Sequence, residues 1–434
     1  MVLCPQMGVQ QELTDHLLRD YTEPIRDPLW GHMYIWGPLL SLMDTPEGQQ
    51  LGRIRQLGPT AMVYPGATHT RLSHSFGVFH IARRILLRLL HHPQCPALTL
   101  EGVRAFLAAA LLHDVGHFPY THSFKSLPLM EHETLTGRLV QTGGLATRLR
   151  ERVQVEPGIV AAIVDEQLPD CGSDEIRLYR RILSGTMDPD KLDYLNRDAY
   201  FCGVPYGVQD LDYALNQIIP NGYNGIALEE SGVSAVENIL FSKYLMYRAV
   251  YWHRTVRVAT AMVKKAVFLG LRDGAIQPED LYGLDDQLFF SRVGGIAYEP
   301  FQLIRGVAER ALLKPVATIP FDPSRSAHQA LQRQEFRSTL EEQISGDLGV
   351  APWEVILDLP DAISFEADIP IIGPDGPCPF VTRSVFSPDV VSRFTGQLRK
   401  IRLIVPQRVI RLLTDPHQYL LNLLAAQVSP GETP

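Results

Sequence analysis

The sequence predicts a mainly α-helical protein with a smaller mixed α+β region at its C-terminal end. From Trp36 to Leu269 most long apolar segments repeat with the helical period, and short loops containing proline or glycine separate them. After Gly270 the apolar segments become short, rich in β-branched residues and bounded by proline, glycine or aspartate, as strands are. The composition, 45% hydrophobic and 20% charged, is that of a globular chain and excludes a disordered or fibrous one.

The expected elements follow in chain order. Residues 1–26 are polar and contain proline, so we expect an N-terminal arm there. Helices are predicted at 81–90, 103–113, 131–141, 178–183, 191–201 and 233–269, and the last of these runs about ten turns without glycine or proline. Strands are predicted at 353–359, 363–372 and 400–405. We therefore expect a helical core at 27–275 and a C-terminal α+β region at 276–434, with a soft boundary near 270–300.

Charge, cysteine usage and hydropathy restrict the class of protein. Lys and Arg number 40 and Asp and Glu 48, and the net charge of −8 disfavours a nucleic-acid-coating surface while leaving room for a local basic cleft. The cysteines are five in number without a CxxC pair, which favours a reducing compartment over a disulfide framework or zinc ribbon. They are Cys4, Cys95, Cys171, Cys202 and Cys378. The chain begins without a signal-peptide pattern and its longest apolar run is 105–112, so we expect a cytoplasmic protein with no membrane partner.

Histidines are concentrated in one part of the chain. Nine of the 14 fall within 64 of the 434 residues. Imidazole offers two kinds of chemistry, metal ligation and proton transfer, and either would explain such a cluster. The nine are His69, His74, His80, His91, His92, His113, His117, His122 and His132.

The most informative segment is an apolar helix, 105–112, that delivers His113 and Asp114 at its end before Gly116 breaks it. Adjacent helical side chains point about 100° apart, so both reach one ion only if further ligands arrive from other helices. His74 and Asp190 are the candidates, and such a set suits Fe, Mn, Zn or Co better than Ca. The alternative is an ordinary helix end at which the imidazole caps a carbonyl. Spacing alone leaves both open.

The stretch 188–198 carries charged and aromatic residues at helical spacing. If a helix starts near Pro189, then Asp190, Tyr194 and either Arg197 or Asp198 share one face. A solvated face with ordinary helix-start chemistry would give the same pattern.

A third feature is a basic segment. Between Asn238 and Arg272 there is no acidic residue, and Lys243, Tyr247 and Tyr251 recur every four residues with Arg254 one turn on. A phosphate-rich ligand would explain cations and aromatic rings on one face. An exposed basic helix packed against acidic neighbours is the alternative. The cations are Lys243, Arg248, Arg254, Arg257, Lys264, Lys265 and Arg272.

Taken together, these motifs resemble the HD-domain metal-dependent phosphohydrolases, and more narrowly their deoxynucleoside triphosphate triphosphohydrolase branch. The matching segments between Asp27 and Arg257 are, in order, DPLWGHMYIWGPLLSLMDTPEGQQLGRIRQLG, VYPGATHTRLSHS, LLHDVGHFPYTH, DPDKLDYLNRD and YRAVYWHRT. The resemblance implies that the helical core is an HD domain. It also implies the bacterial type of chain, without the sterile alpha motif that precedes the core in animal enzymes.

The resemblance implies a role for each matching residue. One divalent transition metal (Fe, Mn, Zn or Co) would be held by His74, His113, Asp114 and Asp190. The reaction centre would comprise Asp114, His117, His122 and His132, with His132 as the proton donor. The triphosphate would be held by Arg71, Lys191, Lys243 and Arg248. The deoxyribose would lie against Gln56, Leu57, Tyr194, Asp198 and Tyr251. The implied enzyme is a homo-oligomer, dimer or tetramer, that converts a deoxynucleoside triphosphate, with Mg or Mn accompanying it, to deoxynucleoside and inorganic triphosphate.

Departures from the family pattern bear on turnover and regulation. Lys125 stands where the animal enzyme has an aspartate that partners the proton donor, so either Glu131 or Glu133 replaces it, or turnover is slower, or the enzyme acts on a different substrate. In the family's purine-sensing pocket Asp44 and Gln49 match, whereas Gly52 and Glu23 replace an arginine and a lysine, so any activation by purines should follow different rules. Two other functions stay open: an HD phosphohydrolase acting on other nucleotides or single-stranded nucleic acid, and a catalytically weak nucleotide-binding sensor.

Overall fold

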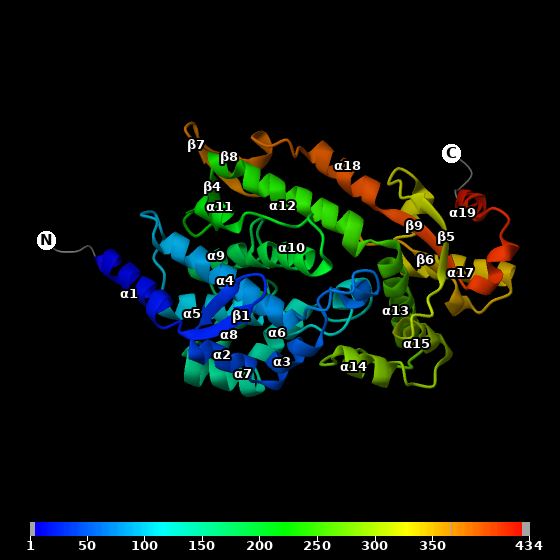
Figure 1. Ribbon diagram of the computed structural model, residues 1–434, viewed down its shortest axis with the longest axis horizontal. Helices are drawn as coiled ribbons and strands as arrows, with labels where there is room; N and C mark the ends of the chain where they lie inside the picture. Colours follow the sequence, from blue (N-terminus) through cyan, green and yellow to red (C-terminus); the bar gives the residue numbers. More distant parts are fainter. Residues whose placement is uncertain (1–4, 366, 428–434) are drawn as a thin grey trace.

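The computed structural model describes residues 5–365 and 367–427, so Cys4 and the ends of the arm and of the C-terminal region lie outside the described residues. It confirms a mainly helical chain with small sheets. The helical part, at the left of Figure 1, packs around α4 and α5 in one large hydrophobic cluster. Its helices are α1 (Pro5–Arg19), α2 (Gly37–Met43), α3 (Pro46–Gln50), α4 (Arg71–Leu90), α5 (Leu100–Leu112), α6 (His132–Val140), α7 (Gly143–Arg148), α8 (Pro157–Val164), α9 (Asp174–Leu183), α10 (Pro189–Cys202), α11 (Leu211–Asn216) and α12 (Val233–Met246).

The remainder of the chain mixes helices and strands (Figure 1, right). Its helices are α13 (Arg254–Arg272), α14 (Asp286–Leu288), α15 (Gln302–Ala308), α16 (Ser326–Ala330), α17 (Gln334–Leu348), α18 (Pro388–Leu398) and α19 (Pro416–Ala425). An antiparallel sheet in the order β5-β9-β6 is built from β5 (Lys314–Pro320), β6 (Ile356–Asp358) and β9 (Lys400–Val405). A second hydrophobic cluster forms around α13 and α15, and a third lies between this sheet, α17 and α19.

A four-stranded sheet ties the two parts together. Its order is β3-β4-β7-β8, and the β4–β7 pair is parallel while the other pairs are antiparallel. The strands are β3 (Ile218–Pro220), β4 (Ile226–Glu229), β7 (Pro370–Gly373) and β8 (Gly376–Pro379). Because β4 and β7 are more than 140 residues apart in the chain, this pairing closes the C-terminal region back onto the helical part.

The single helix predicted at 233–269 is wrong, because the structure has two helices there. α12 ends in a wide π-helical turn at 247–251, and α13 starts afresh after His253, whose backbone leaves the helical region (φ −54°, ψ 139°). The Nδ1 atom of His253 accepts a hydrogen bond from the Thr255 amide at 3.2 Å and so caps α13. Neither glycine nor proline marks this break, so periodicity alone could not find it.

Predicted strands and the predicted arm also differ in extent. Of 363–372, the described part forms a strand only at β7, because Pro360 and Pro370 bracket an extended segment that has no strand partner until residue 370. The segment predicted as an arm forms α1 and then β1 (Glu23–Asp27), which pairs with β2 (Gly31–Ile35). Leu13 and Leu17 on α1 are buried in the large cluster. The predicted division at 275/276 crosses the second cluster, which contains residues from both sides.

A buried ion cluster fixes α10 against the N-terminal hairpin. Arg197 is fully buried, and its guanidinium donates to Asp27 Oδ2 at 2.7 Å and to Asp193 Oδ2 at 2.7 Å. Trp30 Nε1 also donates to Asp193, at 2.6 Å. The two carboxylates are therefore tolerated in the interior because Arg197 supplies a shared positive charge and aligned hydrogen bonds satisfy their oxygens.

Replacing Arg197 with alanine is expected to lower the free energy of unfolding by about 3–5 kcal/mol, since two buried carboxylates lose their counterion. Urea denaturation followed by circular dichroism measures the loss. Arg84→Ala is the control, because Arg84 pairs at the surface with the exposed Asp212 and should cost far less. Equal losses in the two variants would show that the buried cluster is not the source of the stability.

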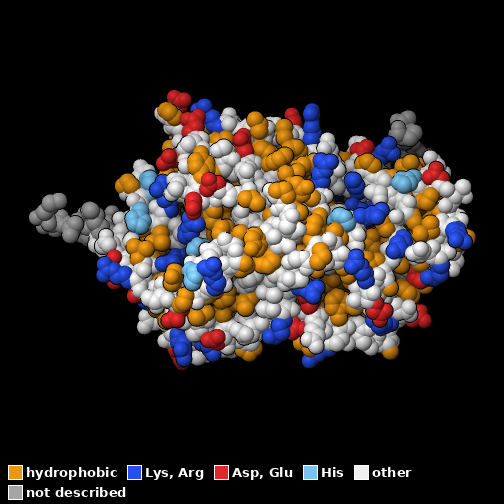
Figure 2. All heavy atoms as spheres, viewed as in Figure 1, with side chains coloured by type: hydrophobic (Ala, Val, Ile, Leu, Met, Phe, Trp, Pro, Cys, Tyr) orange, Lys and Arg blue, Asp and Glu red, His pale blue; other side chains and the backbone are white. Residues whose placement is uncertain are grey.

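Two surface properties complete the fold. Along the described helices, none combines the length and the apolar character that crossing a membrane requires. In Figure 2, hydrophobic side chains gather along the upper middle of the molecule, where Figure 1 places α12 and α18. These helices pack through Tyr244 and Phe394, whose rings stack at 4.4 Å, and Phe241 beside them stays 48% exposed.

Candidate active site

Three helix ends bring the four predicted metal ligands together. His74 lies in the first turn of α4, His113 and Asp114 directly follow α5, and Asp190 lies in the first turn of α10. His74, His113 and Asp114 each offer a ligand atom within 4.8 Å of the others. Asp190 Oδ1 lies 2.9 Å from His74 Nε2 and 3.9 Å from His113 Nε2. Four side chains from three segments thus converge on one point.

Hydrogen bonds orient both imidazoles so that their Nε2 atoms face this point. His74 Nδ1 donates to Asp193 Oδ2 at 2.8 Å, and His113 Nδ1 donates to the Ala110 carbonyl at 2.9 Å. The second contact is the carbonyl cap considered above as the alternative, so His113 caps its helix and still has its other nitrogen for a ligand. His113 Nε2 is buried without a hydrogen-bond partner among the described residues. A carboxylate or carbonyl behind each ring is the arrangement of a metal-ligating histidine.

The charges around this point favour a cation. Burial lowers the pKa of His74, but hydrogen bonds to Asp190 and Asp193 outweigh it and raise the pKa to about 10. Burial likewise raises the pKa of Asp114, but His117, His113 and Arg71 outweigh it and hold that pKa well below its usual range. Two carboxylates therefore face two imidazoles in the interior. This donor set fits a divalent transition metal and lacks the oxygen ligands that Ca²⁺ needs.

A second group of histidines stands beside the first. His117, His122 and His132 offer nitrogens within 4.8 Å of one another, and the rings of His117 and His132 are 4.0 Å apart. Gly116 makes the approach of α6 feasible, because a Cβ atom there would lie 2.3 Å from the His132 carbonyl. The Thr136 hydroxyl fastens the same junction: it accepts from the Gly116 amide and donates to the His113 carbonyl, each at 3.0 Å.

Glu133 is the carboxylate that partners His132. Its Oε2 lies 3.0 Å from His132 Nδ1. Burial raises the pKa of Glu133, but its close contact with His132 outweighs burial and lowers the pKa to about 2, so Glu133 is ionised at neutral pH. Glu133, next to His132 in the chain, is therefore the carboxylate beside this imidazole, whereas Lys125 is exposed at the rim of the same cleft.

Both groups open into a cleft of about 680 Å³. Its volume lies in the range of about 300–1,000 Å³ typical of small-molecule sites. Most predicted substrate residues line it: Gln56, Leu57, Arg71, Lys191, Tyr194, Asp198, Lys243 and Tyr251. Arg248 does not, because it points outward and donates to the Tyr244 hydroxyl at 3.0 Å. His122 and His132 line the cleft, whereas His117 is buried behind them.

The face of α10 resolves the choice left by the sequence. Asp190, Tyr194 and Asp198 line the cleft, while Arg197 points into the interior. Asp198 is held at both oxygens, by His69 Nε2 at 2.8 Å and by the Tyr251 hydroxyl at 2.6 Å. The face is therefore a structured polar wall and not a solvated surface.

The basic segment divides at the helix break. On α12, Lys243 lines the cleft and donates to the Ser364 carbonyl at 2.8 Å. On α13, Arg257 pairs with Asp358 and Lys265 with Glu341, so this half is a basic helix packed against acidic neighbours. Arg254, predicted to extend the Lys243 face, is exposed and does not line the cleft. Packing against acidic neighbours therefore describes α13, although Arg257 also lines the cleft.

Sequence reasoning missed several residues that the structure places here. Arg55 lines the cleft near Gln56, Asp193 holds His74, and His69 holds Asp198. His69 belonged to the histidine cluster and Asp193 flanked the predicted face, but neither position carried a signal for its partner. Lys191 lines the cleft as expected, and its ammonium group is held by Asp188 Oδ2 at 2.5 Å and the Gly185 carbonyl at 3.0 Å.

Two known protein families match separate parts of this chain. The HD domain matches residues 71–173, and the HD-associated region matches residues 219–371. The first range contains both histidine groups, and the second contains Lys243, Tyr251 and the segment 360–364 that closes the cleft. The cleft therefore lies between the two matched regions.

Known proteins with similar sequences include uncharacterised and named relatives. An uncharacterised protein of Bacillus subtilis, YwfO, is 34% identical over 55% of this chain and 54% of its own length. An uncharacterised protein of Methanocaldococcus jannaschii is 31% identical over 60% of this chain and 53% of its own. The deoxynucleoside triphosphate triphosphohydrolase SAMHD1 of Danio rerio is 28% identical over 56% of this chain and 45% of its own. The chain spans about half the length of the curated relatives it matches.

Solved structures share the fold over most of the chain. A hypothetical protein from Aquifex aeolicus superposes with a TM-score of 0.68 at 26% identity, covering 90% of this chain and 98% of that one. A phosphohydrolase from Bacteroides thetaiotaomicron has the same TM-score of 0.68 at 23% identity over 89% of this chain and 100% of its own, which shows the fold. The C-terminal region that matched no motif in the sequence thus belongs to a recurring architecture.

Proposed function

Because the chain carries an HD domain followed by an HD-associated region, we propose that it is a metal-dependent phosphohydrolase that cleaves deoxynucleoside triphosphates to deoxynucleoside and inorganic triphosphate. The observation that carries the proposal is the convergence of His74, His113, Asp114 and Asp190 in one cleft with the His132–Glu133 pair and several cations. The sequence similarity to the triphosphohydrolase SAMHD1 supports the choice of substrate.

The cleft offers separate surfaces to the parts of such a substrate. Arg71, Lys191 and Lys243 supply positive charge to a triphosphate, which suits its oxygens because arginine binds them through paired donors and lysine as a point charge. Leu57 supplies an apolar surface for the sugar. The Tyr251–Asp198 pair, joined by a hydrogen bond, supplies a fixed polar surface for it. A deoxyribose, which lacks the 2′-hydroxyl, matches a wall that is partly apolar.

In the proposed reaction, His132 protonates the leaving 5′-oxygen. Glu133 stays ionised and stabilises the imidazolium form through Nδ1, leaving Nε2 to donate the proton. Arg71 donates to Asp114 Oδ2 at 2.6 Å and lies where it can also neutralise charge on a phosphoryl oxygen. A divalent metal held by the four ligands would polarise that phosphate as a Lewis acid. It would also make a water molecule acidic enough to lose a proton and attack the phosphate.

The first test is a chromatographic assay of the purified protein with each deoxynucleoside triphosphate. It is run with and without Mn²⁺, and with mixtures of nucleotides as activators. Deoxynucleoside released together with intact triphosphate supports the proposal, and the ranking of the four substrates gives the base preference. His113→Ala, prepared in parallel, excludes a contaminating phosphatase.

Product absent from every mixture would contradict the proposal and favour the nucleotide sensor. Release of monophosphate or cleavage of oligonucleotides would favour another HD phosphohydrolase activity. The Glu133–His132 contact favours turnover over the sensor, because the proton donor has kept a carboxylate partner. The homo-oligomer stays a prediction that sedimentation equilibrium can test.

Replacing Lys243 with alanine is expected to raise KM for triphosphates more than KM for monophosphates, with kcat changed little. The reason is that a point charge in the phosphate half of the cleft contributes to binding in proportion to the charge it faces. Steady-state kinetics with both classes of nucleotide measure the effect, and Arg248→Ala, outside the cleft, is the control. Equal effects on both classes would remove Lys243 from the triphosphate site.

A further inference from the structure

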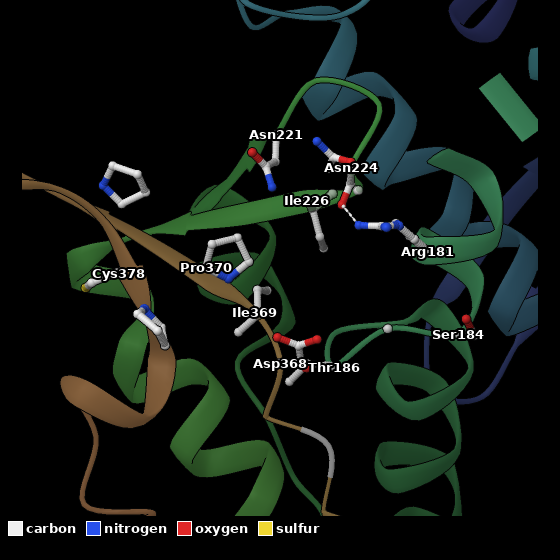
Figure 3. A pocket seen from close by; sticks show the side chains of 14 residues that line it. Arg181, Ser184, Thr186, Asn221, Asn224, Ile226, Asp368, Ile369, Pro370 and Cys378 are labelled. Atoms are coloured by element: carbon white, nitrogen blue, oxygen red, sulfur yellow. Dashed lines mark hydrogen bonds between the residues drawn. The ribbon is translucent and has the colours of Figure 1, made fainter. Parts of the chain in front are cut away.

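A second cavity, also of about 680 Å³, contains none of the predicted site residues. It lies between the loop joining α9 to α10, the turn joining β3 to β4, and the strands β7 and β8 (Figure 3). Segments from three distant parts of the sequence therefore build its walls. Ser184 borders both this cavity and the active-site cleft, so the two are neighbours across the α9–α10 loop.

Several polar groups on its walls have no partner within the described chain. The Thr186 hydroxyl is buried, with the residue 4% exposed, and makes no hydrogen bond. The side chains of Asn221, Asn224 and Asp368 line the cavity and make no hydrogen bond or ion pair with described residues, but Asn221 is half-buried and Asn224 and Asp368 are exposed, so their polar groups are open to a ligand and do not require one. Figure 3 shows Asn221 and Asn224 on one side and Asp368 with Thr186 on the other. A buried hydroxyl without a partner is costly unless a ligand or water satisfies it.

The charge and the remaining walls define the chemistry of the ligand. Arg181, whose Nη1 donates to the Asn224 carbonyl at 3.1 Å, is the lining cation, and Asp368 is the lining anion, so the cavity is close to neutral. Ile226, Ile369 and Pro370 supply apolar surface. Amide, hydroxyl and carboxylate groups around apolar walls suit a flat ring with both donors and acceptors. A phosphate ester would meet Asp368 and only one cation.

We propose that this cavity binds an uncharged nucleoside, distinct from the nucleotide that the cleft takes. The choice of nucleoside rests on the proposed function, because that reaction releases a neutral deoxynucleoside. The edge of the base is bound by the amides of Asn221 and Asn224 and by the Asp368 carboxylate. The Thr186 hydroxyl forms a hydrogen bond with the same ligand.

The position of the cavity couples it to the active site. Gly185 lines the cavity, and its carbonyl accepts from Lys191 Nζ at 3.0 Å on the side of the cleft. Three residues on, Asp188 caps α10 through the Lys191 amide at 2.6 Å. A ligand that shifts the 185–188 loop therefore acts on Lys191 and on the start of the helix that carries Asp190. Occupancy of the cavity should change KM for the triphosphate.

Equilibrium dialysis with radiolabelled deoxyadenosine and thymidine tests the proposal on the full chain. Wild-type protein should bind nucleoside at a site whose affinity falls roughly 2- to 10-fold in Thr186→Val and again in Asp368→Asn, since each loses one hydrogen bond. The Thr186→Val change keeps the shape and breaks no hydrogen bond of the fold. Asp375→Asn is the matched control, because Asp375 lies in the β7–β8 turn and is 91% exposed.

A cleft variant separates this proposal from the proposed function. Asp198→Ala should lose nucleoside binding in the cleft and keep the site that responds to Thr186→Val. If the enzyme acts on some other substrate, nucleoside binding sensitive to Thr186 and Asp368 still persists. Binding unaffected by both cavity substitutions would overturn the proposal. Deoxyadenosine monophosphate binding as well as deoxyadenosine at the Thr186-sensitive site would overturn the assignment to an uncharged ligand.

Discussion

Replacing His113 with alanine is expected to yield a folded protein that has lost its divalent metal and its phosphohydrolase activity. His113 Nε2 faces Asp114 Oδ1 at 3.4 Å and Asp190 Oδ1 at 3.9 Å, so its removal leaves those carboxylates without the imidazole. Two adjacent carboxylates and a single histidine hold a transition metal far more weakly than the full set. Asp114→Ala should have the same result because it removes a central ligand.

Elemental analysis of the purified variants, alongside nucleotide hydrolysis, measures both losses. His91→Ala is the matched control, because His91 is an exposed histidine at the end of α4 that caps the Leu87 carbonyl. Circular dichroism shows whether the fold is intact. A His113→Ala protein that still carries one metal ion per chain would contradict the ligand set.

Replacing the carboxylate that orients His74 should weaken metal binding less than replacing a metal ligand does. Asp193 accepts from His74 Nδ1 at 2.8 Å and is buried. Such an orienting carboxylate typically contributes about 10–100-fold in metal affinity. Asp193→Asn should therefore weaken metal binding by roughly that factor without abolishing it, as a competition titration with a chelator would measure. Equal affinity would show that the carboxylate serves only Arg197 and Trp30.

Replacing His132 with alanine is expected to spare the metal and lower kcat by roughly 10²–10⁴, the usual contribution of a general acid. His132 is 7% exposed and belongs to the second histidine group, beside the four proposed metal ligands. Its loss leaves the 5′-oxygen to depart without a proton. The substrate surfaces at Lys243 and Tyr251 are untouched, so KM should change much less than kcat.

Steady-state kinetics together with metal analysis check this result. Glu133→Gln is the informative companion, because it keeps the shape of the side chain and removes the charge beside His132 Nδ1. It should lower kcat less than His132→Ala does, and combining the two changes should add little, since Glu133 acts through His132. An unchanged kcat in His132→Ala would transfer the proton-donor role to His122 or to water.

Much of the local structure follows from short-range pattern. The helices α5 and α10 start within three residues of the predicted positions, at Thr99 and Asp188, whose side chains accept hydrogen bonds from first-turn amides. The helix predicted at 81–90 is too short, because α4 already starts at Arg71, where Thr70 caps it. The sheet strands β6 and β9 lie within the predicted segments because β-branched runs bounded by proline or aspartate identify them. The sequence pattern did not predict the helix break at His253, because a histidine that caps a helix has no distinctive composition around it.

Most of the site residues that the sequence predicted do line the cleft, but few of the contacts among them could be predicted. It left Arg197 and Asp198 as equal choices, and the rotation of α10 sends the first to Asp27 and the second to Tyr251. It left Glu131 and Glu133 equal, and the close packing of α6 at Gly116 puts Glu133 beside His132. Arg248 carried the same charge signal as Lys243 but points away from the cleft.

The sequence by itself determined the helical class and the division into a helical part and a mixed C-terminal part, and its resemblance to a known family supplied the four side chains proposed as metal ligands. These depend on periodicity and on motifs of a few residues, which local spacing encodes. Tertiary structure alone decided which carboxylate serves which histidine, which cations face the cleft and which pair with acids on α17 and β6, and where the second cavity forms. Several of those outcomes depend on contacts between segments far apart in the sequence, such as Arg257 with Asp358, and only the packed chain brings such partners together.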